Sequence, residues 1–151
     1  MKINIISVGQ FKNDNLGDIF YGYLYKLPWE SKLNEIKPSK NKNKLEQKKI
    51  DSQNLISKTN NSEIVISLDK SGEIISTQQL TRLINKWHYE TKNINFLIGG
   101  SEGISDNCLN KSNMIISLGK MTWPHLLVRV MLAEQLYRAS TIIANHPYHR
   151  N

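Results

Sequence analysis

The segment from Pro124 to Ile143 limits most strongly how this chain can fold. Its apolar residues recur so closely that they cover almost the whole circumference of a helix. A helix that is apolar on all sides has to be buried. One small domain can rarely cover every side, so we expect a second copy of the chain to cover the rest and form a homodimer. The alternative is a central helix wrapped by this chain alone. Glu134 and Arg138 are spaced to pair on the helix.

A polar tail, residues 145–151, follows this helix directly. It combines two His, a Tyr and an Arg within a few positions. Chain ends are usually frayed and dispensable. Imidazole, phenol and guanidinium groups attached to a buried helix instead favour the wall of a binding site.

β-Branched runs alternate with helical periodicity along the rest of the chain. Helices are predicted over 14–27, 44–58 and 77–90 and from Ser105, with Asp14 as a cap of the first. Strands are predicted at 2–8, 33–36, 64–68, 94–98 and 114–118. The strand at 64–68 is expected to end at Asp69, in a turn through Gly72. The alternation predicts one α/β domain over residues 1–151, with a mainly parallel sheet flanked by helices.

Cysteine and apolar content favour a cytoplasmic protein. Cys108 is the only cysteine, which excludes an intramolecular disulfide and a multi-cysteine zinc site and fits a reducing compartment. No run approaches the ~20 apolar residues of a membrane span, and the first residues lack the core of a signal peptide. His146 and His149 have no carboxylate or thiolate nearby in sequence, so we expect no metal.

The net charge of +7 allows two interpretations. Lys outnumbers Arg sixteen to four, as expected of a lysine-rich solvated surface. The window 31–50 holds seven Lys and two Glu. It is either a solvated segment or an electrostatic arm toward RNA phosphates. Three of the four Arg, at 129, 138 and 150, lie near the end of the chain, and Arg forks onto phosphates and carboxylates.

Three predicted strands end in loops with unusual chemistry: Leu68-Asp69, Gly99–Gly103 and Leu118–Trp123. In parallel sheets ligands bind beyond the carboxyl ends of strands. The glycine cluster reads G-G-x-x-G late in the chain, which fits neither a dinucleotide fingerprint nor a phosphate-binding P-loop. The loop 118–123 offers backbone N–H and C=O groups between apolar side chains, which suits a flat purine, although an ordinary loop would also look like this.

Ordered motifs along the chain resemble the ribosomal RNA large-subunit methyltransferase H family. They are FLIGGSEG at 96–103, TWPHLLVRV at 122–130, EQLYRA at 134–139 and NHPYHR at 145–150, with a similar opening KINIISVG at 2–9. The resemblance implies a SPOUT-type fold with a C-terminal trefoil knot and a homodimer. It also implies methyl transfer from S-adenosylmethionine to N3 of a pseudouridine in 23S rRNA, on assembled ribosomes. A non-catalytic ribosome-binding factor of this fold and a SPOUT enzyme acting on transfer RNA are the alternatives.

The resemblance also assigns roles to residues. The cofactor pocket it implies consists of Leu68, Gly99, Leu118, Gly119, Lys120, Met121, Thr122 and Trp123. Two positions depart from the family pattern, since Ser101 stands where Pro is common and Trp123 where a smaller apolar residue is common. His125 and His149 are our candidates for a base.

The remaining candidates contact the RNA. Arg129 and Arg150 are expected to hold phosphates or to stabilise the deprotonated base. Tyr148 and His149 are further substrate contacts, with the phenol ring stacking on a base. In a dimer the tail of one subunit would complete the pocket of the other.

Overall fold

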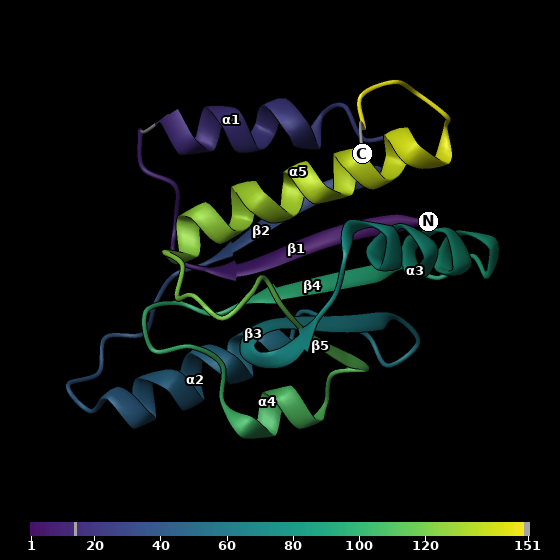
Figure 1. Ribbon diagram of the computed structural model, residues 1–151. Helices are drawn as coiled ribbons and strands as arrows, with labels where there is room; N and C mark the ends of the chain where they lie inside the picture. Colours follow the sequence, from purple (N-terminus) through teal and green to yellow (C-terminus); the bar gives the residue numbers. More distant parts are fainter. Residues whose placement is uncertain (14, 150–151) are drawn as a thin grey trace.

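The computed structural model describes residues 1–13 and 15–149, and within them the strands form one sheet in which every neighbouring pair is parallel. The strand order is β2-β1-β4-β3-β5 (Figure 1). The strands are β1 (Lys2–Val8), β2 (Glu30–Ile36), β3 (Ile64–Ile74), β4 (Ile94–Ile98) and β5 (Met114–Ser117). The α/β class and the parallel sheet predicted from the sequence are confirmed. The carboxyl ends of the five strands meet at one edge of the sheet, on the left of Figure 1.

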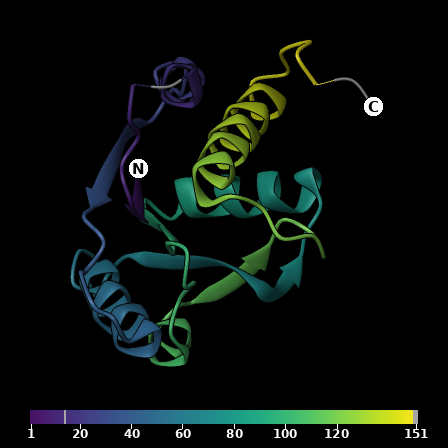
Figure 2. The same cartoon turned by 90° about the vertical axis from the view of Figure 1, so that its left-hand side faces the viewer.

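Helices cover both faces of the sheet (Figures 1 and 2). The helices are α1 (Asn15–Leu24), α2 (Lys44–Ile56), α3 (Thr77–Tyr89), α4 (Asp106–Asn110) and α5 (His125–Ile143). One apolar core joins α1, α3 and α5 to the sheet through buried residues such as Phe20, Ile84 and Leu136. A smaller core joins α2 and α4 to the other face through Leu55 and Leu109. Strands buried on both faces explain the near-continuous apolar runs in the sequence.

The expected end of β3 at Asp69 is wrong. The Asp69 carboxylate does form a turn, accepting hydrogen bonds from the backbone N–H and the hydroxyl of Ser71 at 2.9 and 2.7 Å. The chain then rejoins the sheet, and Glu73 pairs with Ile116 of β5 after a register shift. Gly72 makes this possible, because a Cβ there would lie 2.7 Å from the Ile115 carbonyl carbon. The turn signals therefore mark a bulge inside a longer strand.

Local capping fixes where the helices begin. Ser76 and Gln79 form a reciprocal capping box at the start of α3, and the Asn43 side chain accepts two backbone N–H groups of α2. The predicted cap Asp14 lies outside the described residues. In the described part of the chain, no helix has the length and apolarity needed to cross a bilayer.

Candidate functional site

A cavity of about 640 Å³ opens at the carboxyl ends of β3, β4 and β5. The three loops predicted from the sequence to carry unusual chemistry line this cavity. Its lining includes all of the expected cofactor residues except Lys120, which is exposed between Gly119 and Met121: Leu68, Gly99, Leu118, Gly119, Met121, Thr122 and Trp123. Because parallel strands end at the same edge, residues separated by about fifty positions meet in one site.

Glycines bring the backbone to the cavity wall. A Cβ on Gly99 would lie 2.7 Å from the Gly103 carbonyl carbon and 2.9 Å from the side chain of Ile104, so only glycine fits there. Gly119 has a φ of +113°, which L side chains rarely adopt. The Ser117 hydroxyl holds this turn by donating to the Gly119 carbonyl at 2.8 Å and accepting its N–H at 3.2 Å. The wall therefore offers backbone groups at fixed positions to a ligand.

Trp123 lines the cavity with a half-buried indole ring. Its N–H is buried and has no hydrogen-bond partner among the described residues. A buried donor without an acceptor costs roughly 1–3 kcal/mol. A ligand that offered an acceptor to this N–H would recover that cost.

His125 begins α5 and lies against the end of β1. A Cβ on Gly9, which has a φ of +98°, would lie 3.0 Å from His125 Nε2. Burial and the charge of Arg129 lower the pKa of His125 below its ordinary value of 6.5. The imidazole is therefore neutral near pH 7 and able to accept a proton, at the rim of the cavity that it lines.

Arg129, one turn further along α5, is fully buried. Its guanidinium donates to the Glu35 carboxylate at 2.8 Å and to the carbonyls of Val8 and Gly9 at 3.0 and 2.9 Å. It also lies 4.8 Å from the centre of the Phe11 ring. These contacts join α5 to the ends of β1 and β2. They leave the guanidinium no exposed surface for a phosphate and place it behind His125.

Known proteins of one family match this chain over nearly its whole length. A family model described as "Predicted SPOUT methyltransferase" matches residues 1–149. The chain is 41% identical to Ribosomal RNA large subunit methyltransferase H of Coxiella burnetii, covering 99% of this chain and 100% of the relative. It is 33% identical to the protein of the same name from Rhodospirillum centenum, with 99% of both chains covered. This chain belongs to the ribosomal RNA large subunit methyltransferase H family of SPOUT methyltransferases.

Solved structures share the fold of this SPOUT methyltransferase at low sequence identity. A probable methylase family protein from Haemophilus influenzae aligns with a TM-score of 0.62 at 11% identity, over 99% of this chain and 70% of that one. A probable methyltransferase from Bordetella pertussis aligns with a TM-score of 0.60 at 9% identity, over 91% of this chain and 95% of that one. At these identities the likeness concerns the fold alone.

The tail of this SPOUT methyltransferase folds back along the second half of α5. The rings of Tyr148 and Tyr137 have their centres 4.8 Å apart, and Arg138 Cζ lies over the Tyr148 ring, 5.0 Å from its centre. A hydrogen bond with Tyr23, together with burial, raises the pKa of Tyr148 to about 12. The phenol is therefore protonated and donates to Glu134 at 3.3 Å. Glu134 also accepts from Arg138 at 2.9 Å, as the spacing predicted.

The two candidate bases do not share a site within one chain. His149 lies 3.4 Å from both Arg138 and Gln78. His125 is the first residue of α5, 13 positions before Arg138 and therefore about 20 Å from it along the helix. Arg150 lies outside the described residues.

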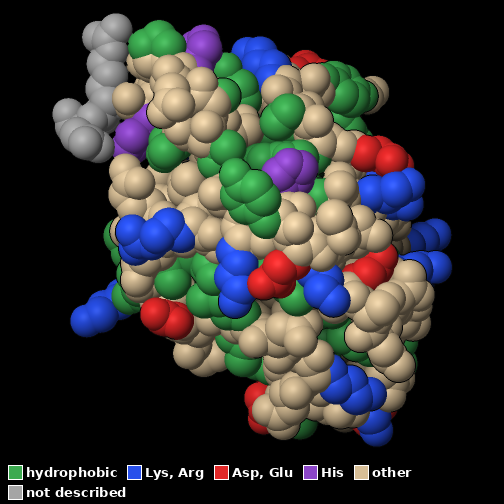
Figure 3. Space-filling model, turned by 90° about the vertical axis from the view of Figure 1, so that its right-hand side faces the viewer, with side chains coloured by type: hydrophobic (Ala, Val, Ile, Leu, Met, Phe, Trp, Pro, Cys, Tyr) green, Lys and Arg blue, Asp and Glu red, His purple; other side chains and the backbone are tan. Residues whose placement is uncertain are grey.

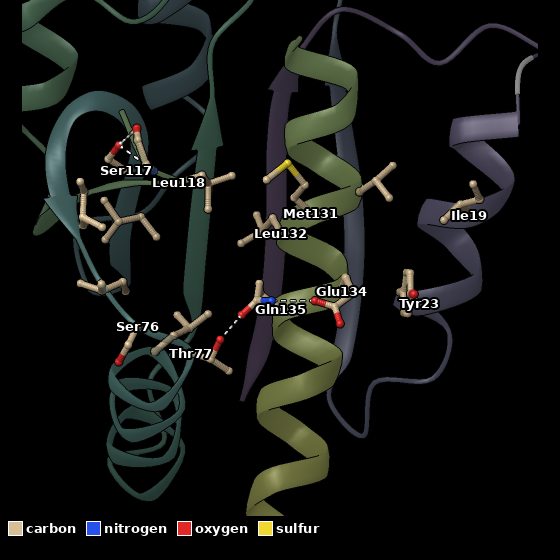
Figure 4. Close-up of a pocket in the computed structure, with 16 residues that line it drawn as sticks. Ile19, Tyr23, Ser76, Thr77, Ser117, Leu118, Met131, Leu132, Glu134 and Gln135 are labelled. Atoms are coloured by element: carbon tan, nitrogen blue, oxygen red, sulfur yellow. Dashed lines mark hydrogen bonds between the residues drawn. The ribbon is translucent and has the colours of Figure 1, made fainter. Parts of the chain in front are cut away.

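A second cavity, of about 480 Å³, is an apolar groove along the uncovered side of α5 (Figure 4). Figure 4 shows Ile19 and Tyr23 of α1 to the right of α5, and Met131 and Leu132 of α5 on its left, toward the loop after β5. This chain alone therefore leaves part of α5 open. Residues 116–119 line both the groove and the first cavity, so one loop forms a wall of each.

Sequence reasoning missed three residues at this site. Gly9 follows β1 and gives His125 its space, but a single glycine after a strand gives no signal of its own. Glu35 binds Arg129 across 94 positions of sequence, and no local pattern indicates that pair. Lys48 of α2 lines the cavity, and the lysine-rich composition around it was its only signal.

Proposed function

We propose that this protein transfers a methyl group from S-adenosylmethionine to N3 of a pseudouridine in 23S rRNA on assembled ribosomes. The observation that carries the proposal is the glycine-walled cavity with a neutral His125 at its rim, in a chain of this family. A protein with this substrate works in the cytoplasm, where ribosomes are.

The residues at the cavity fit S-adenosylmethionine. A volume of about 640 Å³ lies within the range of ligand pockets, roughly 300–1,000 Å³. Leu118, Met121 and Trp123 offer apolar surfaces for a purine, and the backbone from Leu118 to Gly119 offers donors and acceptors for its edge. The buried N–H of Trp123 is a further donor. When bound, the cofactor would supply an electrophilic methyl group on its sulfonium. Lys120 would contribute through its backbone, since the residue is exposed and is not part of the cavity lining.

His125 is the base we favour for the imino proton of N3. Its lowered pKa keeps the ring ready to accept a proton near pH 7. General base catalysis contributes roughly 10²–10⁴-fold, and fixing two reactants in line contributes roughly 7–11 kcal/mol. Arg129 acts as a positioning residue, because it fixes the first turns of α5 against β1 and β2.

A homodimer completes this proposal. The apolar groove on α5 is the surface that a second copy would cover, because Ile19 keeps 47% of its surface exposed there and Ile74 keeps 55%. The described part of the tail packs on the second half of α5, at Glu134 and Arg138, about 14–20 Å along the helix from His125 of the same subunit. Tyr148, His149 and Arg150 would therefore serve the cavity of the partner subunit, where they contact the RNA.

The SPOUT architecture adds a trefoil knot in the C-terminal segment of a single domain over residues 1–151. Two features support it. The chain leaves β5 at the edge of the sheet, and α5 then returns to pack against α1, α3 and β4. Such a return is what threading the C-terminal segment through earlier loops requires.

The test is transfer of labelled methyl from S-adenosylmethionine to ribosomes that lack this modification, with free 23S RNA and transfer RNA in parallel. Mass spectrometry then locates the label. We expect methyl on a pseudouridine of ribosomal 23S rRNA. Label in transfer RNA alone would identify transfer RNA as the substrate. If titration with S-adenosylmethionine released no heat, the result would favour a non-catalytic ribosome-binding factor.

A further inference from the structure

A cluster of lysines between β2 and the middle of α2 has no acidic partner. Among the described residues, no ion pair is formed by any of these six: Lys37, Lys40, Lys42, Lys44, Lys48 and Lys49. All but Lys48 are exposed. Glu46 is the only acidic residue between 37 and 50, and Asp51 accepts the backbone N–H of Ser39 at 2.7 Å. Elsewhere Lys2 and Lys86 pair with Glu30 and Glu90.

The arrangement is electrostatically unfavourable for the protein on its own. Lys44 and Lys48 are four apart on one helix, a spacing at which like charges repel. Lys44 is also the first residue of α2, in the turn where the helix dipole disfavours cations. An anion bound at this surface would relieve both effects.

The topology places the cluster beside the candidate active site. Residues 37–43 leave β2 at its carboxyl end, the same edge at which the loops after β3, β4 and β5 form the cavity (Figure 1). Lys48 lines the cavity together with Lys70. The Ser52 hydroxyl, one turn after Lys48, accepts the Ser105 N–H at 2.8 Å and so fixes α2 against the loop that follows Gly103.

The opposite edge of the sheet carries charges of both signs. Figure 3 faces the right-hand side of Figure 1, where the strands begin, and there Lys and Arg side chains lie among Asp and Glu. On the side of the cavity, by contrast, the six lysines follow one another within thirteen residues that contain a single acidic residue, Glu46, so positive charge is dense where a substrate has to enter.

We propose that residues 37–49 form a docking surface for rRNA phosphates and hold the RNA segment next to the target nucleotide at the cavity mouth. This inference rests on the proposed function and names the protein surface that its substrate contacts. RNA phosphates fit because the cluster is cationic, directly adjoins the cavity and exposes only one large apolar residue, Leu45. Phosphate contacts of this kind set position and affinity without reading sequence.

The experiment compares two triple variants of equal charge. The test variant is K40Q/K42Q/K44Q. The control is K58Q/K92Q/K111Q, whose lysines are also exposed but precede β3, β4 and β5 at the opposite edge. Affinity for ribosomes is measured by sedimentation between 50 and 200 mM salt, values chosen to span the range in which phosphate contacts weaken steeply, and it is repeated on protein-free 23S RNA.

We expect the test variant to bind at least about tenfold more weakly and its plot of log affinity against log salt to be shallower by about two, since each phosphate contact contributes about 0.7–0.9 to that slope. The control should keep the wild-type slope. Equal slopes for the two variants would overturn the proposal. So would a difference seen on ribosomes but not on protein-free RNA, since that would place the contact on ribosomal protein.

Binding and methyl transfer are read separately. If the slopes differ but the wild type transfers no methyl, the proposed function fails and the docking surface stands. If transfer occurs and the slopes agree, only the docking surface fails. Calorimetry with S-adenosylmethionine should give the same affinity for both variants, which checks that the cavity is intact.

Discussion

The Arg129 guanidinium donates to the Glu35 carboxylate at 2.8 Å and so joins α5 to the end of β2, across 94 residues of sequence. The Arg129 side chain is fully buried, while Glu35 keeps 25% of its side chain exposed. The same carboxylate oxygen accepts the Phe11 N–H at 2.7 Å. One ion pair thus fixes α5, the β1–α1 loop and the sheet edge together, directly behind His125.

Replacing Arg129 by Met should destabilise the protein by roughly 3–5 kcal/mol, because Val8 and Gly9 lose their donor and the Glu35 charge loses its partner. Arg129→Lys should have a stability between those of the wild type and Arg129→Met, since an ammonium keeps the charge but lacks the planar fork. Urea unfolding measures both. Arg82→Ala, at an exposed site on α3, is the control and should change stability by less than about 0.5 kcal/mol. A wild-type unfolding midpoint for Arg129→Met would show that the buried pair contributes nothing.

The pH dependence of methyl transfer should report His125. Burial and Arg129 lower the pKa of this ring below 6.5, so we expect the single-turnover rate to fall on acidification with a midpoint below 6.5. The stability of the protein should also fall on acidification. Because the folded state binds the proton less readily than the unfolded chain, the free energy of unfolding rises with pH up to about 6.5 and falls as the pH drops toward the folded pKa.

His125→Asn should remove both dependences and slow transfer by roughly 10²–10⁴-fold. His88→Asn, on the exposed face of α3, should leave the rate and its pH profile unchanged. An acid limb that survives in His125→Asn would assign the titration to another group.

Gly99→Ala should weaken S-adenosylmethionine binding at least tenfold, because the new methyl group would lie 2.7 Å from the carbonyl carbon of Gly103 and the loop would have to move. Isothermal titration measures the affinity. Gly22→Ala is the matched change, on an open site of α1 with no atom within 4 Å of the added carbon. It should bind the cofactor normally and gain roughly 0.5–1 kcal/mol of stability, since alanine favours a helix interior. Normal cofactor binding by Gly99→Ala would remove the close approach as a feature of the site.

Ile19→Glu should convert a dimer into monomers, because it places a charge in the apolar groove along α5. Sedimentation equilibrium measures the mass. Leu45→Glu is the control, since Leu45 is 77% exposed on α2, outside the groove. A dimer that persists in Ile19→Glu would place the interface elsewhere.

Helices and strands were predictable where the periodicity was strong, and the failures have local causes. The start of β2 was missed because Glu30, Ser31 and Lys32 are poor strand formers at a half-exposed sheet edge. The end of β3 was misplaced because Asp69 and Gly72 carry turn chemistry, although pairing with β5 resumes beyond them. Turn residues show where the backbone bends, but pairing decides whether the strand ends.

The candidate site also has features that the sequence predicts and features that only the structure shows. The three loops were predictable because parallel strands deliver their carboxyl ends to one edge, whatever the fold details. The partners of Arg129 were not, because a contact across the sheet leaves no trace in local spacing. The distance between His125 and the tail also needed the structure, since it depends on how α5 is laid across the sheet.

Complementation would decide whether the tail acts across the dimer. One variant carries His125→Asn with its tail intact, and the other keeps His125 but lacks residues 146–151. Each alone should be nearly inactive. Because the tail packs on Glu134 and Arg138, which lie about 14–20 Å along α5 from His125, we expect co-expressed subunits to regain activity, as the tail of the first variant reaches the cavity of the second. Random pairing makes about half of the dimers mixed, each with one intact site, so recovery should approach about a quarter of wild type. If each tail instead served its own cavity, no mixed dimer would hold an intact site and methyl transfer would stay at the level of the separate variants.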